Sequence, residues 1–109
     1  MQTLQQVFRI QDSEKKDNML EIASDKYCRT ILEIIRFKPK SAIEIVAETG
    51  IPVSTVYRRI QMLHDNKLLT TSGNINEEGK KFFLYKSKIK GMNCNFNEGQ
   101  VEVELILNN

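Results

Sequence analysis

The sequence lacks several features by which many classes of protein are recognised. Its 109 residues include no tryptophan, two prolines, two cysteines and a single histidine, His64. No apolar run approaches the roughly 20 residues of a membrane-spanning helix, and the N-terminus has no apolar core of a signal peptide. We therefore expect a cytoplasmic protein with no membrane partner, long enough for one domain with a modest core.

The scarcity of cysteine and histidine also limits the chemistry. Cys28 and Cys94 are far apart and fit no CxxC or Cys/His ligand spacing. We expect two reduced thiols, with Cys28 on a helix and Cys94 on the apolar face of a strand; a disulfide between them is the less favoured alternative. His64 has no second histidine, paired nucleophile or glycine-rich phosphate loop to work with. The sequence indicates no enzyme, no metal site and no cofactor.

Charge is nearly balanced overall but unevenly distributed. The formal net charge is +2, yet residues 80–90 hold five lysines and no acid, whereas residues 98–109 hold three glutamates and no base. Overall charge alone does not indicate a nucleic-acid partner, so the distribution and the motifs must decide.

The first third of the chain predicts an extension followed by a helix. Residues 1–11 suit either a short strand or one helical turn, and residues 12–18 are expected to form a polar linker. From Met19 the apolar spacing is helical, and Ser24 is a plausible N-cap of a helix that ends before Pro39. The expected buried set of this helix is Tyr27, Cys28, Ile31, Leu32, Ile34 and Ile35.

A second, short helix is predicted after Ser41. Ser41 and Glu44 have the spacing of a capping box, and Gly50 is a typical left-handed residue at the C-terminal end. The expected apolar stripe of this helix is Ile43, Val46 and Ala47.

Residues 53–65 predict a third helix with two different sides. On a 3.6-residue repeat the apolar side consists of Val53, Val56, Ile60 and Leu63. The opposite side consists of Ser54, Tyr57, Arg58 and Gln61, with Thr55 and Arg59 on its flanks. No acid precedes Asp65 in this helix, whereas an ordinary solvated helix face usually carries glutamate and lysine.

Two hairpins complete the chain. Residues 68–74 and 80–86 predict strands around a turn at 76–79, and residues 92–97 and 101–105 alternate apolar and polar side chains around Glu98-Gly99. The second hairpin has one apolar face that must be covered.

The order of these elements resembles the winged helix-turn-helix domains of ArsR-like prokaryotic, especially archaeal, transcription regulators. The segments that carry the resemblance are residues 19–35, 41–47, 52–60 and 63–69. The expected fold is α+β: a three-helix core and a β-hairpin wing over residues 19–90, an N-terminal extension at 1–18 and a C-terminal β-hairpin extension at 91–109.

The resemblance implies that the helix at 53–65 enters the major groove of double-stranded DNA and that the hairpin contacts the flanking backbone. The implied DNA-binding residues are Ser54, Thr55, Tyr57, Arg58, Arg59, Gln61, Lys38, Lys40, Lys80 and Lys81. For Arg59 a structural ion pair is an equal alternative, and Tyr57 could equally pack. Glu77 and Glu78 at the hairpin turn and Pro52 at the helix start depart from the family pattern.

The sequence therefore favours a DNA-binding transcription regulator, expected to be a homodimer because one module of this size contacts few bases. The alternative is a winged-helix protein–protein interaction module, which the near-neutral charge and acidic turn favour. RNA binding is a weaker possibility, because no run of exposed aromatics is present. The C-terminal hairpin could pack on its own subunit, form the dimer surface or sense an unknown effector.

Overall fold

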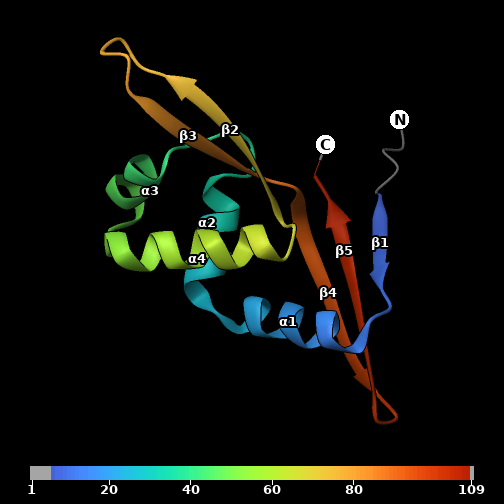
Figure 1. Cartoon of the computed structure of the whole chain (residues 1–109). Helices are drawn as coiled ribbons and strands as arrows, with labels where there is room; N and C mark the ends of the chain where they lie inside the picture. Colours follow the sequence, from blue (N-terminus) through green and yellow to red (C-terminus); the bar gives the residue numbers. More distant parts are fainter. Residues whose placement is uncertain (1–5, 109) are drawn as a thin grey trace.

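The computed structural model describes residues 6–108, which form an α+β fold (Figure 1). Within these residues one strand is followed by four helices and then by four strands. The elements are β1 (Val7–Ile10), α1 (Ser13–Ser24), α2 (Lys26–Ile34), α3 (Ala42–Thr49), α4 (Val53–Asp65), β2 (Leu69–Ile75), β3 (Lys81–Ser87), β4 (Ile89–Asn97) and β5 (Gln100–Leu107). The α+β class is confirmed. In this part of the chain no helix has the length and apolar character needed to cross a membrane.

Helix α1 begins six residues before the predicted start at Met19. The carboxylate of Asp12 caps it by accepting a hydrogen bond from the Lys15 amide at 3.0 Å. The linker predicted at 12–18 is therefore wrong, because residues 13–18 are helical. The reason is that only Met19 and Ile22 of α1 are buried, so the first half of the helix shows no apolar periodicity.

A second aspartate separates α1 from α2. Ser24, the predicted N-cap, is the last residue of α1, and Asp25 caps α2 by accepting from the Cys28 amide at 2.8 Å. The Ser24 hydroxyl instead donates to the carbonyl of Glu21. Asp25 has extended backbone angles that place its carboxylate over the first turn of α2.

Both ends of α3 follow the prediction. Ser41 Oγ accepts from the Glu44 amide at 3.1 Å, and the Ser41 amide donates to Glu44 Oε1 at 3.0 Å, which confirms the capping box. Gly50 has a φ of 74°, a left-handed conformation that costs glycine little. The buried Ile51 then leads directly into α4.

The predicted buried stripe of α3 is wrong. Ala42 and Ile45 are the buried residues, whereas Ile43 is 64% exposed. Val46 is half-buried and Ala47 is exposed. The helix is rotated by about one residue from the predicted phase, because α2 and α4 both pack against the side that carries Ala42 and Ile45. A helix of two turns has too few positions for periodicity to fix its phase.

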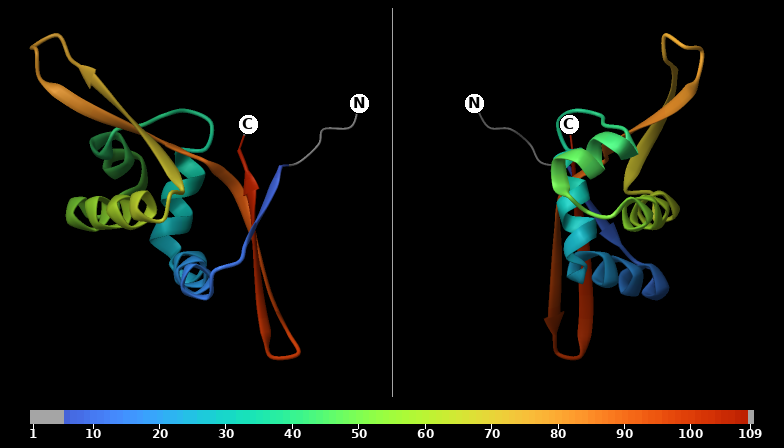
Figure 2. Two further views of the ribbon diagram at one scale, coloured as in Figure 1. Left: turned by 45° about the vertical axis from the view of Figure 1, so that its right-hand side comes forward. Right: turned by 90° about the vertical axis from the view of Figure 1, so that its left-hand side faces the viewer.

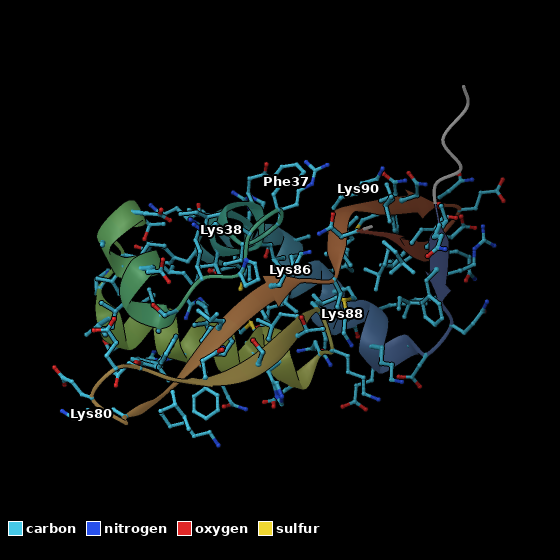
Figure 3. The ribbon with its side chains drawn as sticks, turned by 90° about the horizontal axis from the view of Figure 1, so that it is seen from above. Phe37, Lys38, Lys80, Lys86, Lys88 and Lys90 are labelled. Carbon is cyan, nitrogen blue, oxygen red and sulfur yellow. The ribbon has the colours of Figure 1, made fainter. Side chains whose placement is uncertain are left out.

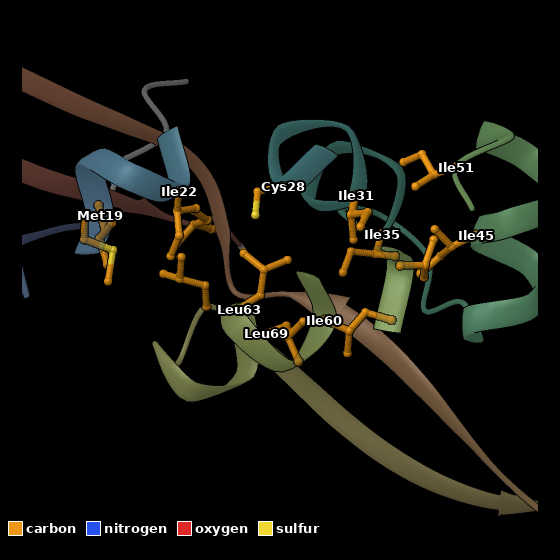
Figure 4. Close-up of a cluster of buried hydrophobic side chains, with 14 of the residues drawn as sticks. Met19, Ile22, Cys28, Ile31, Ile35, Ile45, Ile51, Ile60, Leu63 and Leu69 are labelled. Carbon is orange, nitrogen blue, oxygen red and sulfur yellow. The ribbon is translucent and has the colours of Figure 1, made fainter. Parts of the chain in front are cut away.

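One hydrophobic core joins the helices to the strands (Figure 4). Cys28 lies in it, with its sulfur 3.8 Å from that of Met62, and burial raises the pKa of its thiol to about 12. Both cysteines are free, as predicted, although Cys94 is exposed on β4. The largest fully buried side chains are those of Ile22, Ile31, Ile35, Ile45, Leu63, Leu68, Val56 and Val103.

Strands β2 and β3 form the first predicted hairpin, shifted by one residue. They pair antiparallel from Leu69 opposite Ser87 to Ile75 opposite Lys81. At their base, Lys40 and Tyr85 form a β-bridge with backbone hydrogen bonds of 3.0 and 2.8 Å. The loop before α3 therefore fixes the root of this hairpin.

Strands β4 and β5 belong to a three-stranded sheet in the order β1-β5-β4. The strand alternative for residues 1–11 is confirmed over Val7–Ile10, and β1 pairs antiparallel with β5. Strands from the two predicted extensions, at 1–18 and 91–109, therefore belong to one sheet. Residues 1–5 of that segment lie outside the described residues.

The two hairpins point in opposite directions from the helices (Figures 1 and 2). The molecule measures 56 × 37 × 22 Å as a result. Strand β3 passes into β4 with Lys88 alone between them. Backbone bonds fix this corner, since Ser87 donates to Ile35 and Lys88 donates to Leu68.

Candidate nucleic-acid interface

Helix α4 is anchored by one side and exposes the other. Val56, Ile60 and Leu63 are buried as predicted, but Val53 is 47% exposed because it begins the helix beyond the packed core. The predicted polar side is confirmed as exposed, and it consists of Ser54, Tyr57, Arg58 and Gln61. Thr55 and Arg59, predicted on its flanks, are half-buried. The side chains suited to reading DNA are therefore accessible on one face.

The N-terminus of α4 is left without a side-chain cap. Pro52 precedes the helix and makes no capping hydrogen bond, and the first turn holds no acidic residue. The first amide groups of a helix have no acceptor within the helix, and together with the helix dipole they favour an anion. The hydroxyls of Ser54 and Thr55 lie in this same turn, which makes it suited to a phosphate group.

Arg58 and Arg59 have different environments. Arg59 forms a two-bond ion pair with Asp25, with Nε 2.9 Å from Oδ2 and Nη2 3.3 Å from Oδ1. Its guanidinium also lies 5.6 Å from the ring centre of Tyr27. Arg58 is exposed. The structure therefore favours the structural alternative for Arg59 and leaves Arg58 as the accessible arginine of this face.

The ion pair changes the pKa of both of its partners. Hydrogen bonding to Arg59, followed by that to the Cys28 amide, outweighs partial burial and lowers the pKa of Asp25 from 3.8 to about 2. The same contact raises the pKa of Arg59. Asp25 thus caps α2 and holds α4 against it, so it fixes the orientation of the exposed face.

Two other predicted contact residues are paired with acids. Gln61 Nε2 donates to Asp65 Oδ1 at 2.8 Å, one turn along α4. Lys40 Nζ lies 2.9 Å from Glu48 Oε1, and the Lys40 side chain is only 14% exposed. Gln61 lies at the surface and can exchange its partner, whereas Lys40 is largely covered and contributes little accessible positive charge.

The remaining predicted lysines lie on different parts of the surface. Seen from above, Lys80 lies at the far end of β2–β3, while Lys38 lies near Phe37 on the loop between α2 and α3 (Figure 3). Lys81 is exposed, with Nζ 5.2 Å from the ring centre of Phe83. Lys80 and Lys81 are thus brought together on the hairpin, and Lys38 is not brought to them.

The hairpin turn also holds the acidic pair noted in the sequence. Asn76 Oδ1 accepts from the amides of Glu78 and Lys80 at 3.0 and 2.9 Å, which orders the turn. Glu77 and Glu78 are exposed there, next to Lys80. The end of the hairpin therefore carries both signs of charge.

Tyr57 has a neighbour that the sequence did not predict. The phenol of Tyr85 on β3 has a raised pKa, chiefly through burial and secondly through the Tyr57 phenol. Tyr57 itself is 51% exposed. Tyr57 is therefore near enough to Tyr85 to affect its pKa, while half of the Tyr57 side chain stays accessible.

Two apolar residues at the starts of α3 and α4 are exposed, which the sequence did not predict. Ile43 on α3 and Val53 on α4 were both expected in the core, yet they are 64% and 47% exposed. Their proximity to helix N-termini, where capping sets the helical phase, is the signal that could have identified them. Such residues can contact thymine methyl groups or an apolar patch of a protein.

The described residues offer no evident centre for metal chemistry. Between residues 6 and 108, no three side chains of the histidine, cysteine, aspartate or glutamate type gather as a metal ion would require.

No protein-family model matches this chain, and no curated protein matches it.

Proposed function

We propose that this chain is a sequence-specific, double-stranded DNA-binding transcription regulator of the cytoplasm, with a winged helix-turn-helix fold in which β2–β3 is the wing. It acts as a homodimer, and α4 lies in the major groove. The observation that carries the proposal is the exposed side of α4. That side combines an uncapped N-terminus, accessible hydroxyls and Arg58, and no acid before Asp65.

The arrangement of α3, α4 and the hairpin supports this assignment. The Gly50 turn sets α4 against α3, and the Lys40–Tyr85 bridge sets β3 beside them. A recognition helix reads base edges in the major groove, where arginine pairs with guanine, while wing lysines contact phosphates. Arg58 is the proposed base-reading residue, and Lys80 and Lys81 are the proposed phosphate contacts.

A protein–protein interaction module is the second candidate. Exposed Ile43 on α3 and Val53 on α4 favour it, because exposed apolar side chains are suited to contact with another protein. The glutamates at the hairpin turn and the pairing of Lys40 with Glu48 reduce the positive charge available for DNA.

Fluorescence anisotropy with a labelled random-sequence duplex across a salt series tests the proposal. Binding should weaken linearly in log salt, with a slope of about −0.9 for each phosphate contacted. After an operator is selected, Arg58→Ala should cost about 1–3 kcal/mol of specific binding. Arg9→Ala is the matched control, because it removes the same charge from β1. Absence of binding at low salt would overturn the proposal in favour of the protein–protein module, and equal losses in both variants would remove Arg58 as a base contact.

A further inference from the structure

Strand β4 has one edge that no strand in the described part of the chain covers. β5 lies between β1 and β4, so β4 pairs on one side only. Residues 93–97 are exposed, and Phe96 is 77% exposed. This part of the hairpin extends beyond α1, away from the helices (Figure 2).

This edge lacks the usual protection against pairing with another chain. Proteins commonly place charges, proline or a bulge along an exposed edge strand. Residues 91–97 read Gly-Met-Asn-Cys-Asn-Phe-Asn, with no charge and no proline. The one irregularity of β4 lies before them, between Ile89 and Gly91. The opposite edge differs, since β1 has four residues and Arg9 lies 3.7 Å from Glu104.

The order of side chains along this edge is nearly symmetric about Cys94. If two copies of the segment pair antiparallel about a two-fold axis at Cys94, Met92 lies opposite Phe96 of the second copy. Asn93 then lies opposite Asn95, and the two Cys94 side chains face each other. Residues directly opposite in antiparallel strands share a face of the sheet, so apolar side chains meet apolar ones and asparagines meet asparagines.

Other registers are less favourable. If the register is shifted by one residue, asparagines lie opposite apolar side chains on the same face of the sheet. A two-fold axis at Asn93 sets Lys90 against Phe96, and one at Asn95 sets Met92 against Glu98. Only the axis at Cys94 uses the whole uncharged segment without bringing a charge into it.

We propose that the chain forms a two-fold dimer in which β4 pairs with β4 of a second copy, centred on Cys94, to give a continuous six-stranded sheet. The exposed ring of Phe96 then packs beside Met92 of the second copy, which is half-buried against the core. The interface is isologous, as two-fold homodimers require. The inference rests on the homodimer part of the proposed function, and its test contains no DNA, so failure of either can be distinguished from failure of the other.

Sedimentation equilibrium over protein concentrations from about 1 to 200 µM tests the dimer, on the scale expected for a weak interface. The wild type should show a monomer–dimer equilibrium. Phe96→Lys should weaken the dimer by at least about ten-fold, because it removes the exposed ring and sets a charge opposite Met92 of the second copy. Ile75→Lys is the matched control, since Ile75 is a similarly exposed apolar residue on β2. Thermal unfolding checks that both variants fold.

Cross-linking tests the register. Cys28 is fully buried, so copper–phenanthroline oxidation in the native state should join two copies through Cys94 alone, and Cys94→Ser should abolish the cross-linked dimer. A monomer at every concentration would overturn the proposal. So would a dimer that Phe96→Lys leaves unchanged, or a dimer that does not cross-link through Cys94.

Discussion

The two hairpins of this protein are built alike but differ in what they expose. β2–β3 contains three lysines and two glutamates, and it begins beside α4. β4–β5 contains one lysine and three glutamates, and the outer half of β4 is uncharged. The first hairpin therefore presents charge next to a polar helix face, and the second presents an uncovered strand edge and exposed apolar side chains.

Both hairpins are anchored at their base and free at their end, and truncation should separate these parts. Leu69→Ala and Ile89→Ala each remove a side chain that is 5% or less exposed, and each should lower the free energy of unfolding by about 2–4 kcal/mol. Ile75→Ala and Phe96→Ala remove side chains that are 73% and 77% exposed, and each should cost less than about 0.5 kcal/mol.

Urea unfolding of dilute protein measures these four changes. Equal losses at base and end would show that the projecting parts pack as tightly as the core, and would contradict the distinction.

The charges of the two hairpins can be compared by equal substitution. Lys80→Ala combined with Lys81→Ala should reduce the salt slope of DNA binding by about two, with similar weakening on all sequences, because these lysines are proposed to contact phosphates. Lys88→Ala combined with Lys90→Ala removes the same charge from the corner and start of β4 and should leave the slope unchanged. Anisotropy titrations measure both, and the reverse result would assign the phosphate contacts to the second hairpin.

The helices between the hairpins should respond to acid through Asp25. The folded pKa of Asp25 is about 2, below its ordinary value of 3.8, so its contribution to stability is complete above about pH 4 and is lost as the pH falls toward 2. With allowance for partial exposure, this contribution is about 1–2 kcal/mol. Asp25→Asn should therefore be destabilised by about this amount at neutral pH and should match the wild type near pH 2.

Chemical unfolding at a series of pH values measures the effect. Asp12→Asn is a useful comparison, because Asp12 caps α1 without an arginine partner. A constant difference between Asp25→Asn and the wild type at all pH values would show that the ion pair is not the source.

The smallest expected effects concern the two turns. Glu98 has a φ of 52° and Gly99 a φ of 78°, as a two-residue hairpin turn requires. Asparagine tolerates the first position better, so Glu98→Asn should raise stability by up to about 0.5 kcal/mol, whereas Gly79→Ala at a φ of 79° should lower it by about 1 kcal/mol. Thermal unfolding measures both, and a stabilising Gly79→Ala would contradict the assigned backbone strain.

The sequence predicted the elements best where several local signals agreed. α4 was predicted with its observed bounds, and the Ser41 cap, the Gly50 turn and both hairpins followed from residue types at fixed spacing. The prediction failed where signals were weak or long-range. The polar half of α1 has no apolar stripe, and the pairing of β1 with β5 joins opposite ends of the chain, so no local pattern indicates it.

The candidate interface was predicted in composition more than in detail. The exposed side of α4 was predicted correctly from periodicity, since a helix of 13 residues is long enough to fix the phase. The partners of Arg59, Lys40 and Gln61 were not predicted, because Asp25, Glu48 and Asp65 become neighbours only after the helices pack or complete a turn. Arg59 in particular depends on a contact across 34 residues of sequence.

The single-residue corner at Lys88 has a consequence for how copies of this protein would be spaced. The backbone of Lys88 is hydrogen-bonded to Leu68 and to Asn108, and these bonds hold β3 and β4 at a fixed angle to each other. In a dimer joined through β4, the distance and angle between the two α4 helices would be set by this corner and not by a flexible linker. We therefore expect that a target with two half-sites tolerates few changes in the number of base pairs between them, and that flexibility for a different spacing would have to come from bending the DNA.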